Sequence, residues 1–166
     1  IVLKLVAYRF RFFRDPWNTQ CRLSYEYLSG DDPGTGDQNE GFDLLFGRWP
    51  RWSELYVYTY AGETRIADVT NVHRIGVGAS IFPVEPLEFC FDYHLLFRDH
   101  NPLHGTSGFS QNGCFRGQLF TFLTRYKISE NVFGHFIAEV FVPGNYYDRS
   151  RNDTAVFLRY ELSFKL

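Results

Sequence analysis

Residues 154–166 read TAVFLRYELSFKL, and apolar and polar side chains alternate along them almost without interruption. The apolar members are Val156, Leu158, Tyr160, Leu162, Phe164 and Leu166, and the polar ones between them are Arg159, Glu161, Ser163 and Lys165. A period of two places the two sets on opposite faces of a β-strand. Because a tilted strand crosses a bilayer with about 9–11 residues, this stretch predicts a strand of a transmembrane β-barrel.

The same alternation recurs upstream. We expect further strands at 133–142, 117–128, 87–97, 71–82, 20–29 and 3–13. The connections between them alternate between brief turns and longer segments rich in Gly, Asn and Asp. Outer-membrane barrels have short periplasmic turns and long extracellular loops, and all the connections fit if residue 166 lies on the periplasmic side. The expected fold is all-β, an antiparallel up-and-down transmembrane β-barrel in a bacterial outer membrane.

The expected strand number indicates a partial barrel. Seven strands are odd, whereas bacterial single-chain barrels close with an even number, and an open edge in lipid leaves backbone groups unpaired. We therefore expect residues 1–166 to be the C-terminal part of one barrel domain, with N-terminal strands missing. The alternative is a further strand within 41–61, since residues 54–61 also alternate.

Composition agrees with a barrel. The chain has 18 Phe, 11 Tyr and 3 Trp, and outer-membrane barrels need aromatic girdles at both interfaces. The net charge of −2 gives no indication of a nucleic-acid partner. The cysteines, Cys21, Cys90 and Cys114, are odd in number and lack metal-type spacing. We predict no disulfide framework and no cofactor.

The polar faces of the strands carry the candidate functional residues. Eight cations face five anions there, and rings of Arg or Lys suit pores that pass anions. The candidate pore-lining residues are Arg9, Arg22, Arg74, Glu88, Asp92, Arg125, Glu139, Arg159 and Glu161. The alternative is that these charges merely pair across neighbouring strands in a wet lumen.

Two loop segments are candidates for binding. Residues 46–52, FGRWPRW, contain Arg48, Trp49, Arg51 and Trp52, which could stack sugar rings or bind carboxylates through Arg forks. Alternatively, this segment folds inward and plugs or braces the barrel. Residues 31–40 are acidic and could supply Ca²⁺ ligands, but they do not match the EF-hand spacing, so we predict no metal site.

Two other classes of protein are alternatives to a porin. An outer-membrane hydrolase could use Asp92 and His94 on one inner face, with His104, Ser107 and Ser110 on a loop. A nucleophile needs a base at hydrogen-bond distance, and the Gly-x-Ser-x-Gly elbow is absent, so we predict no catalytic residues. A soluble ligand-binding barrel would also alternate, but its apolar face would point inward around a cavity.

Four segments resemble a known family. They are 27–37 (YLSGDDPGTGD), 42–56 (FDLLFGRWPRWSELY), 72–78 (VHRIGVG) and 143–147 (PGNYY). Together they are similar to the alginate-export family of outer-membrane porins over most of the chain, and GRWP is their most distinctive part. The resemblance implies a monomeric barrel of about eighteen strands, within the size range of water-filled porins. It also implies a basic lumen that conducts an anionic polysaccharide or another anionic or sugar-derived solute.

Overall fold

The computed structural model describes residues 2–11, 15–42, 52–55 and 70–166, and within 2–11 it describes the backbone alone. These residues form seven strands, one short 3-10 helix and a helical turn at residues 54 and 55. The strands are β1 (Val2–Arg11), β2 (Gln20–Leu28), β3 (Val72–Val84), β4 (Leu87–Arg98), β5 (Phe115–Ser129), β6 (Val132–Pro143) and β7 (Ala155–Phe164), and the 3-10 helix is η2 (Arg149–Arg151). All seven strands predicted from the alternation are confirmed, with bounds that differ by a few residues.

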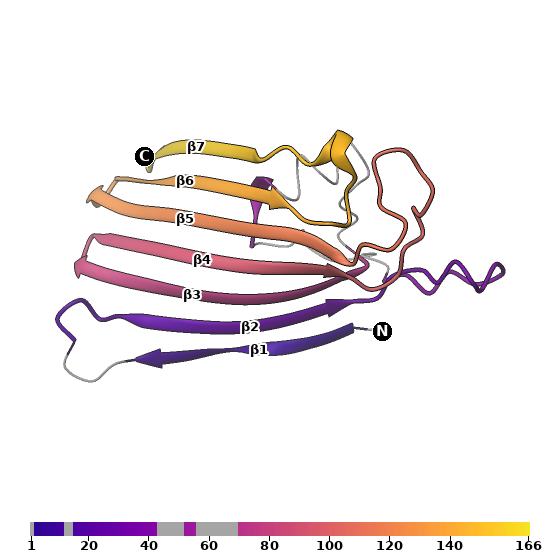
Figure 1. Ribbon diagram of the computed structural model, residues 1–166. Helices are drawn as coiled ribbons and strands as arrows, with labels where there is room; N and C mark the ends of the chain where they lie inside the picture. The colour runs from indigo at the N-terminus through magenta and orange to yellow at the C-terminus, as the bar shows by residue number, and fades with distance from the viewer. Residues whose placement is uncertain (1, 12–14, 43–51, 56–69) are drawn as a thin grey trace.

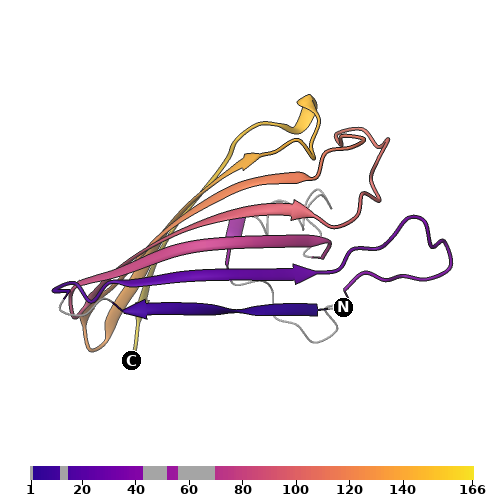
Figure 2. The same cartoon turned by 60° about the horizontal axis from the view of Figure 1, so that its bottom comes forward.

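The strands lie side by side in chain order, β1-β2-β3-β4-β5-β6-β7, and every neighbouring pair is antiparallel. Figures 1 and 2 show one strongly twisted sheet. Among the described residues the sheet does not close on itself, and β1 and β7 are its two edges. The all-β, up-and-down architecture of a partial barrel is therefore confirmed.

Short and long connections between the strands lie at opposite ends of the sheet, as the sequence predicts. Figure 1 shows residues 15–19, which precede β2, and the turns between β3 and β4 and between β5 and β6 at one end of the sheet, which we call the turn end. The described residues next to the strands in the longer connections lie at the opposite end, which we call the loop end. The alternative hypothesis placed a further strand within residues 41–61, where residues 54–61 alternate. Residues 54 and 55 are helical, and residues 56–61 lie outside the described residues.

Among the described residues, no helix combines the length and the apolarity that a membrane-spanning helix requires.

The ladder between β1 and β2 shifts register between Leu5 and Tyr8. Three residue steps on β1 there match two steps on β2, from Tyr25 to Leu23. Such a bulge inserts one extra residue, and it reverses the phase of a period-two pattern. This explains why the alternation in β1 is less regular than in the other strands.

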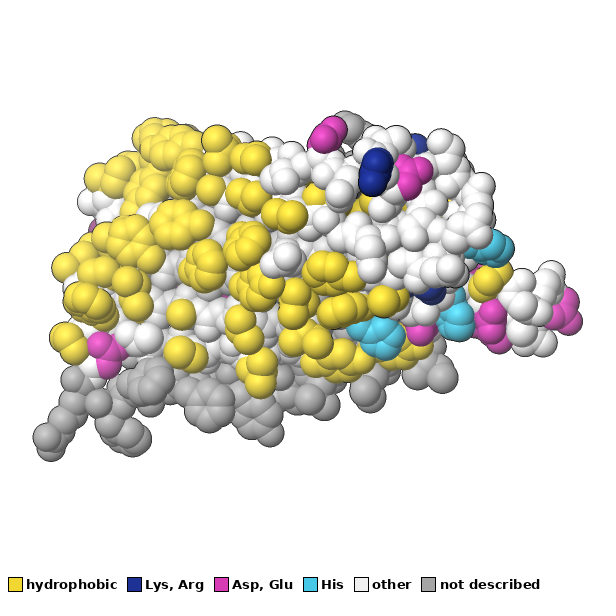
Figure 3. Space-filling model, in the orientation of Figure 1, with side chains coloured by type: hydrophobic (Ala, Val, Ile, Leu, Met, Phe, Trp, Pro, Cys, Tyr) yellow, Lys and Arg dark blue, Asp and Glu magenta, His cyan; other side chains and the backbone are white. Residues whose placement is uncertain are grey.

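One face of the sheet, the outer face, is apolar and exposed. Leu23, Phe91 and Leu158 expose 50%, 50% and 66% of their surface, and Figure 3 shows hydrophobic side chains covering most of this face. A large exposed apolar surface indicates contact with lipid or with another apolar partner. A soluble barrel with an apolar cavity would present the opposite arrangement.

The opposite face, the inner face, changes character along the strands. Towards the loop end its side chains are apolar and covered, and Val72, Leu96, Leu119 and Phe141 are fully buried. Leu55 and the loop residues Phe109, Tyr146 and Tyr147 belong to the same cluster. Nearer the turn end the inner face is polar. The covered core therefore leaves the polar part of the inner face as the place for a functional site.

Candidate functional site

A cavity of about 840 Å³ lies on the polar part of the inner face. Side chains from β2 to β7 line it, together with residues 52–54. Four arginines and four carboxylates are among the described residues that line it, and they are Arg22, Arg74, Arg125, Arg159, Glu54, Glu88, Asp92 and Glu139. The cavity is therefore hydrophilic and highly charged, although its fixed charges balance in this part of the wall.

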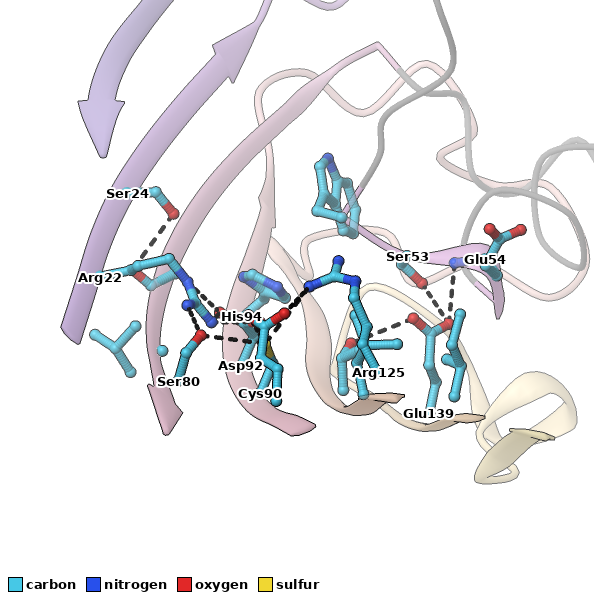
Figure 4. A pocket seen from close by; sticks show the side chains of 18 of the residues that line it. Arg22, Ser24, Ser53, Glu54, Ser80, Cys90, Asp92, His94, Arg125 and Glu139 are labelled. Carbon is cyan, nitrogen blue, oxygen red and sulfur yellow. Dashed lines mark hydrogen bonds and ion pairs between the residues drawn. The ribbon is translucent and has the colours of Figure 1, made fainter. Parts of the chain in front are cut away.

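Arg22 on β2 forms a forked ion pair with Asp92 on β4. Its Nη2 lies 2.9 Å and 3.0 Å from the two carboxylate oxygens, and its Nη1 donates to Ser80 Oγ. The two strands are separated by β3, where Gly78 lies opposite both residues in the ladder. Because Gly78 has no side chain, the pair can reach across β3 (Figure 4). The alternation of residues along the strands assigns Arg22 and Asp92 to the same face, but it does not predict that they bridge two strands that are not neighbours.

Arg74 on β3 occupies the centre of a second cluster. Its Nε donates to Glu26 Oε2 at 3.0 Å, and its Nη1 donates to Ser24 Oγ at 3.2 Å. The same nitrogen lies 3.2 Å from His94 Nδ1, and the guanidinium carbon lies 5.1 Å from the ring centroid of Trp52. The guanidinium is therefore held between a carboxylate, an imidazole and an indole.

The two remaining arginines of the cavity are also paired. Arg125 Nη1 donates to Glu88 Oε2 at 2.8 Å, across the β4–β5 ladder. Arg159 Nη2 lies 3.2 Å from Glu54 Oε1. Each of the four lining arginines thus has a carboxylate neighbour. The sequence comparison of eight cations with five anions did not include Glu54, because that residue was not assigned to the inner face.

Residues 52–55 lie against the inner face and are held there by Glu139 on β6. Glu139 Oε2 accepts hydrogen bonds from Ser53 Oγ at 3.0 Å, from the Glu54 backbone N–H at 3.0 Å and from the Leu55 backbone N–H at 2.6 Å. Its other oxygen, Oε1, accepts from Thr121 Oγ1 at 3.3 Å. Figure 4 shows the Ser53 hydroxyl and the Glu54 backbone nitrogen directed toward this carboxylate. A carboxylate that accepts N–H groups at the start of a helical turn acts as a cap.

The structure places most of the predicted pore-lining residues together. Those that line the cavity are Arg22, Arg74, Glu88, Asp92, Arg125, Glu139 and Arg159. Glu161 lines a second cavity of about 760 Å³ at the turn end. Arg9 lies opposite Arg22 in the β1–β2 ladder, and its side chain lies outside the described part of the chain.

The predicted loop cluster is described in part. Arg48, Trp49 and Arg51 lie outside the described residues. Trp52 lies on the inner face, with its ring centroid 5.7 Å from that of His94. Ser53 and Glu54 also belong to the site, and the sequence analysis did not assign them to the inner face, because a short contact from a long loop does not follow the period of the strands that it contacts.

The acidic loop uses its carboxylates for its own turns. Asp32 Oδ1 accepts the Gly34 N–H at 2.8 Å, and Glu40 Oε2 accepts from Thr35 Oγ1 at 2.9 Å. Within the part of the chain that the structure describes, no group of three or more His, Cys, Asp or Glu side chains is arranged to hold a metal ion.

The loop residues of the hydrolase hypothesis bond to their own backbone. His104 Nδ1 lies 2.9 Å from the Asn101 carbonyl oxygen, and Ser110 Oγ accepts the Gly113 N–H at 2.9 Å. On the inner face, His94 contacts Arg74 and Trp52. The described contacts of these histidine and serine side chains are therefore structural ones.

Asp99 ties the loop end of β2 to the segment after β4. Burial raises the pKa of this carboxyl, but it accepts hydrogen bonds from the Gly30 N–H at 3.1 Å and the Tyr27 hydroxyl at 2.8 Å, which lower the pKa. The neighbouring His100 and His73 lower it further. Together these contacts hold the pKa of Asp99 below its ordinary value of 3.8.

This lowered pKa predicts a pH-dependent loop end. The ionised form is favoured in the folded state, so its stabilisation is complete above pH 3.8 and is lost as the pH falls through the folded pKa. Hydrogen exchange of peptides covering residues 28–32 measures this stabilisation of the loop end. We expect Asp99→Asn to exchange faster than wild type at neutral pH and at the same rate once Asp99 is protonated. An equal difference at both pH values would contradict the assignment.

Comparison with known proteins decides the family. A family model described as alginate export matches residues 5–160. The chain belongs to the alginate-export family. This match confirms the resemblance noted in the sequence. The family is a transporter family, and its proteins are outer-membrane export porins. A search of curated proteins found no match.

Proposed function

We propose that this alginate-export protein passes anionic or sugar-derived solutes along the polar inner face, as a passive porin. The observation that carries the proposal is that the two faces of the sheet differ in polarity. An exposed apolar face suits lipid, and the charged cavity of about 840 Å³ on the other face suits water and polar solutes. The lipid partner is the bacterial outer membrane, and no nucleic-acid partner is involved.

Closure of the barrel is part of the proposal. The unpaired backbone groups on β1 and β7 cannot remain open in hydrocarbon, because each unsatisfied group there costs several kcal/mol. We therefore propose that the sheet is one part of a monomeric barrel domain whose further strands pair with these edges. Such a barrel encloses the inner face and converts the cavity into part of a water-filled passage.

The paired arginines give a means of selection without tight binding. A carboxylate of the solute competes with Glu26, Glu88 or Asp92 for the forked donors of an arginine. Conduction requires favourable entry and weak, repeated contacts. The partner carboxylates limit how tightly each arginine holds a solute, and successive arginines along the wall supply the repeated contacts. Sugar hydroxyls can bond to both members of each pair.

Neutralising two arginines tests this selectivity. In the intact protein, Arg74→Gln with Arg125→Gln leaves Glu26 and Glu88 without their cations. The wall then becomes more negative, so we expect the reversal potential in a planar bilayer under a salt gradient to shift toward that of cations. An unchanged reversal potential in a folded, conducting variant would remove the selectivity proposal.

A charge-compensated variant controls for altered shape. Arg22→Gln with Asp92→Asn removes one cation and one anion from the same wall. Because the net charge stays the same, its reversal potential should shift much less than that of the double arginine variant. Equal shifts in the two variants would mean that disturbed packing, rather than charge, controls ion passage.

A further inference from the structure

Residues 52–55 extend across the inner face and contact both halves of the sheet. Trp52 lies beside Arg74 on β3 and His94 on β4. Glu54 lies beside Arg159 on β7, and Ser53 bonds to β6 through Glu139. The segment thus occupies space on the face along which a solute would move.

We propose that residues 52–55 form a fixed constriction of the passage and that Glu139 is the positioning residue that holds the constriction in place. This inference rests on the proposed function, since a constriction needs a conducting lumen. It assigns a determinant of solute size, whereas the arginine pairs concern solute charge.

The attachment of the segment is firm. Glu139 and Leu55 expose 1% and 2% of their surface, so their contacts are shielded from water. Three donors of the segment converge on one carboxylate oxygen of Glu139, and hydrogen bonds to a charged acceptor are about twice as strong as neutral ones. Leu55 also belongs to the buried cluster at the loop end. Polar and apolar contacts therefore oppose displacement of the segment.

The attachment is also specific in direction. Glu139 caps the helical turn at residues 54 and 55, which fixes the orientation of the backbone there. The Glu54–Arg159 pair lies on the next strand of the sheet, and the Trp52–Arg74 contact fixes the opposite end of the segment. With both ends held, the segment narrows the lumen at a constant place.

Polymer exclusion in planar bilayers tests the proposal. The intact protein is reconstituted, and its single-channel conductance is measured with polyethylene glycols of graded size. Glu139→Ala removes the acceptor for Ser53, Glu54 and Leu55. We expect a higher conductance and a shift of the size cut-off to larger polymers. Glu139→Gln keeps one acceptor oxygen and should show a smaller shift of the cut-off.

Two further variants separate the proposed role from loss of charge or of folding. Glu130→Ala removes one carboxylate from the exposed β5–β6 turn and should leave the cut-off unchanged. Replacement of residues 52–55 by four glycines removes the side chains of the constriction while Glu139 stays. It should shift the cut-off, and adding Glu139→Ala should then change the cut-off no further.

The outcomes distinguish the two proposals. An unchanged cut-off in both Glu139→Ala and the glycine replacement overturns the constriction, while the arginine-dependent reversal potential can still stand. A shift in Glu139→Ala that persists in full after the glycine replacement overturns the positioning role of Glu139. If the wild-type protein conducts no ions, the proposed function fails and the constriction fails with it.

Discussion

Replacing Phe122 by arginine should destabilise the folded sheet by about 2–4 kcal/mol, the cost of a cation on the lipid face near the bilayer midplane. Phe122 lies midway along β5 and is 37% exposed on the outer face. Its ring stacks near that of Phe89, with 6.2 Å between the centroids. The substitution loses this apolar contact and places a guanidinium where water cannot solvate it.

Leu123→Arg is the matched control, because the next residue of the same strand points to the opposite face. Leu123 lines the polar cavity, whose wall also carries the carboxylates of Glu88 and Asp92, so a new cation there lies in a polar environment. We expect a much smaller loss of stability. Both variants can be compared by urea titration of folding into lipid vesicles, with heat-modified migration in gels as the measure of the folded state.

Equal destabilisation by the two substitutions, or a larger effect of Leu123→Arg, would contradict the assignment of the two faces. A larger effect of Leu123→Arg would indicate an apolar interior and a polar exterior, as in a soluble ligand-binding barrel. The comparison therefore tests the orientation on which the porin interpretation depends.

The strands and their faces could be predicted because they depend on local alternation. The strands β2 to β7 follow a period of two, and a one-residue slip would move every apolar side chain to the wrong face. The bulge in β1 is the informative exception, since one inserted residue disturbs the pattern without ending the strand. The alternation of short and long connections then predicts which end of the sheet carries the turns and which carries the loops.

The division of the inner face could not be predicted in the same way. Leu96 and His94 follow the same period, yet Leu96 is covered in the apolar cluster while His94 faces Arg74 and Trp52. What covers each residue depends on long connections that return to the sheet. Residue 55 is 84 residues from Glu139 in sequence, and contacts of this range leave no local signal.

The charge pairs could be predicted in part. The sequence places Arg125 and Glu88 on the inner faces of neighbouring strands, and their register makes them direct cross-strand partners. Arg22 and Asp92 instead bridge two strands that are not neighbours, which requires the glycine between them. The same composition can therefore give either paired or unpaired arginines, depending on register and on small residues.

This role of glycine gives the second prediction with a large effect. A Cβ atom added at Gly78 would overlap Asp92 Oδ1 and lie 3.1 Å from Arg22 Nη2. Gly78→Val must therefore displace the carboxylate and separate the pair. We expect a loss of about 1–3 kcal/mol from overpacking alone, and further loss from the carboxylate that is left without its partner.

Ala79→Val on the outer face of the same strand is the control, because the added methyl groups enter an apolar surface. It should leave the urea midpoint nearly unchanged. Asp92→Ala provides a second comparison, since it removes the atom with which the new side chain collides. Gly78→Val and Asp92→Ala should therefore be less than additive, because each abolishes the same pair. Full additivity would mean that Gly78 is needed for a reason other than room for the Arg22–Asp92 bridge.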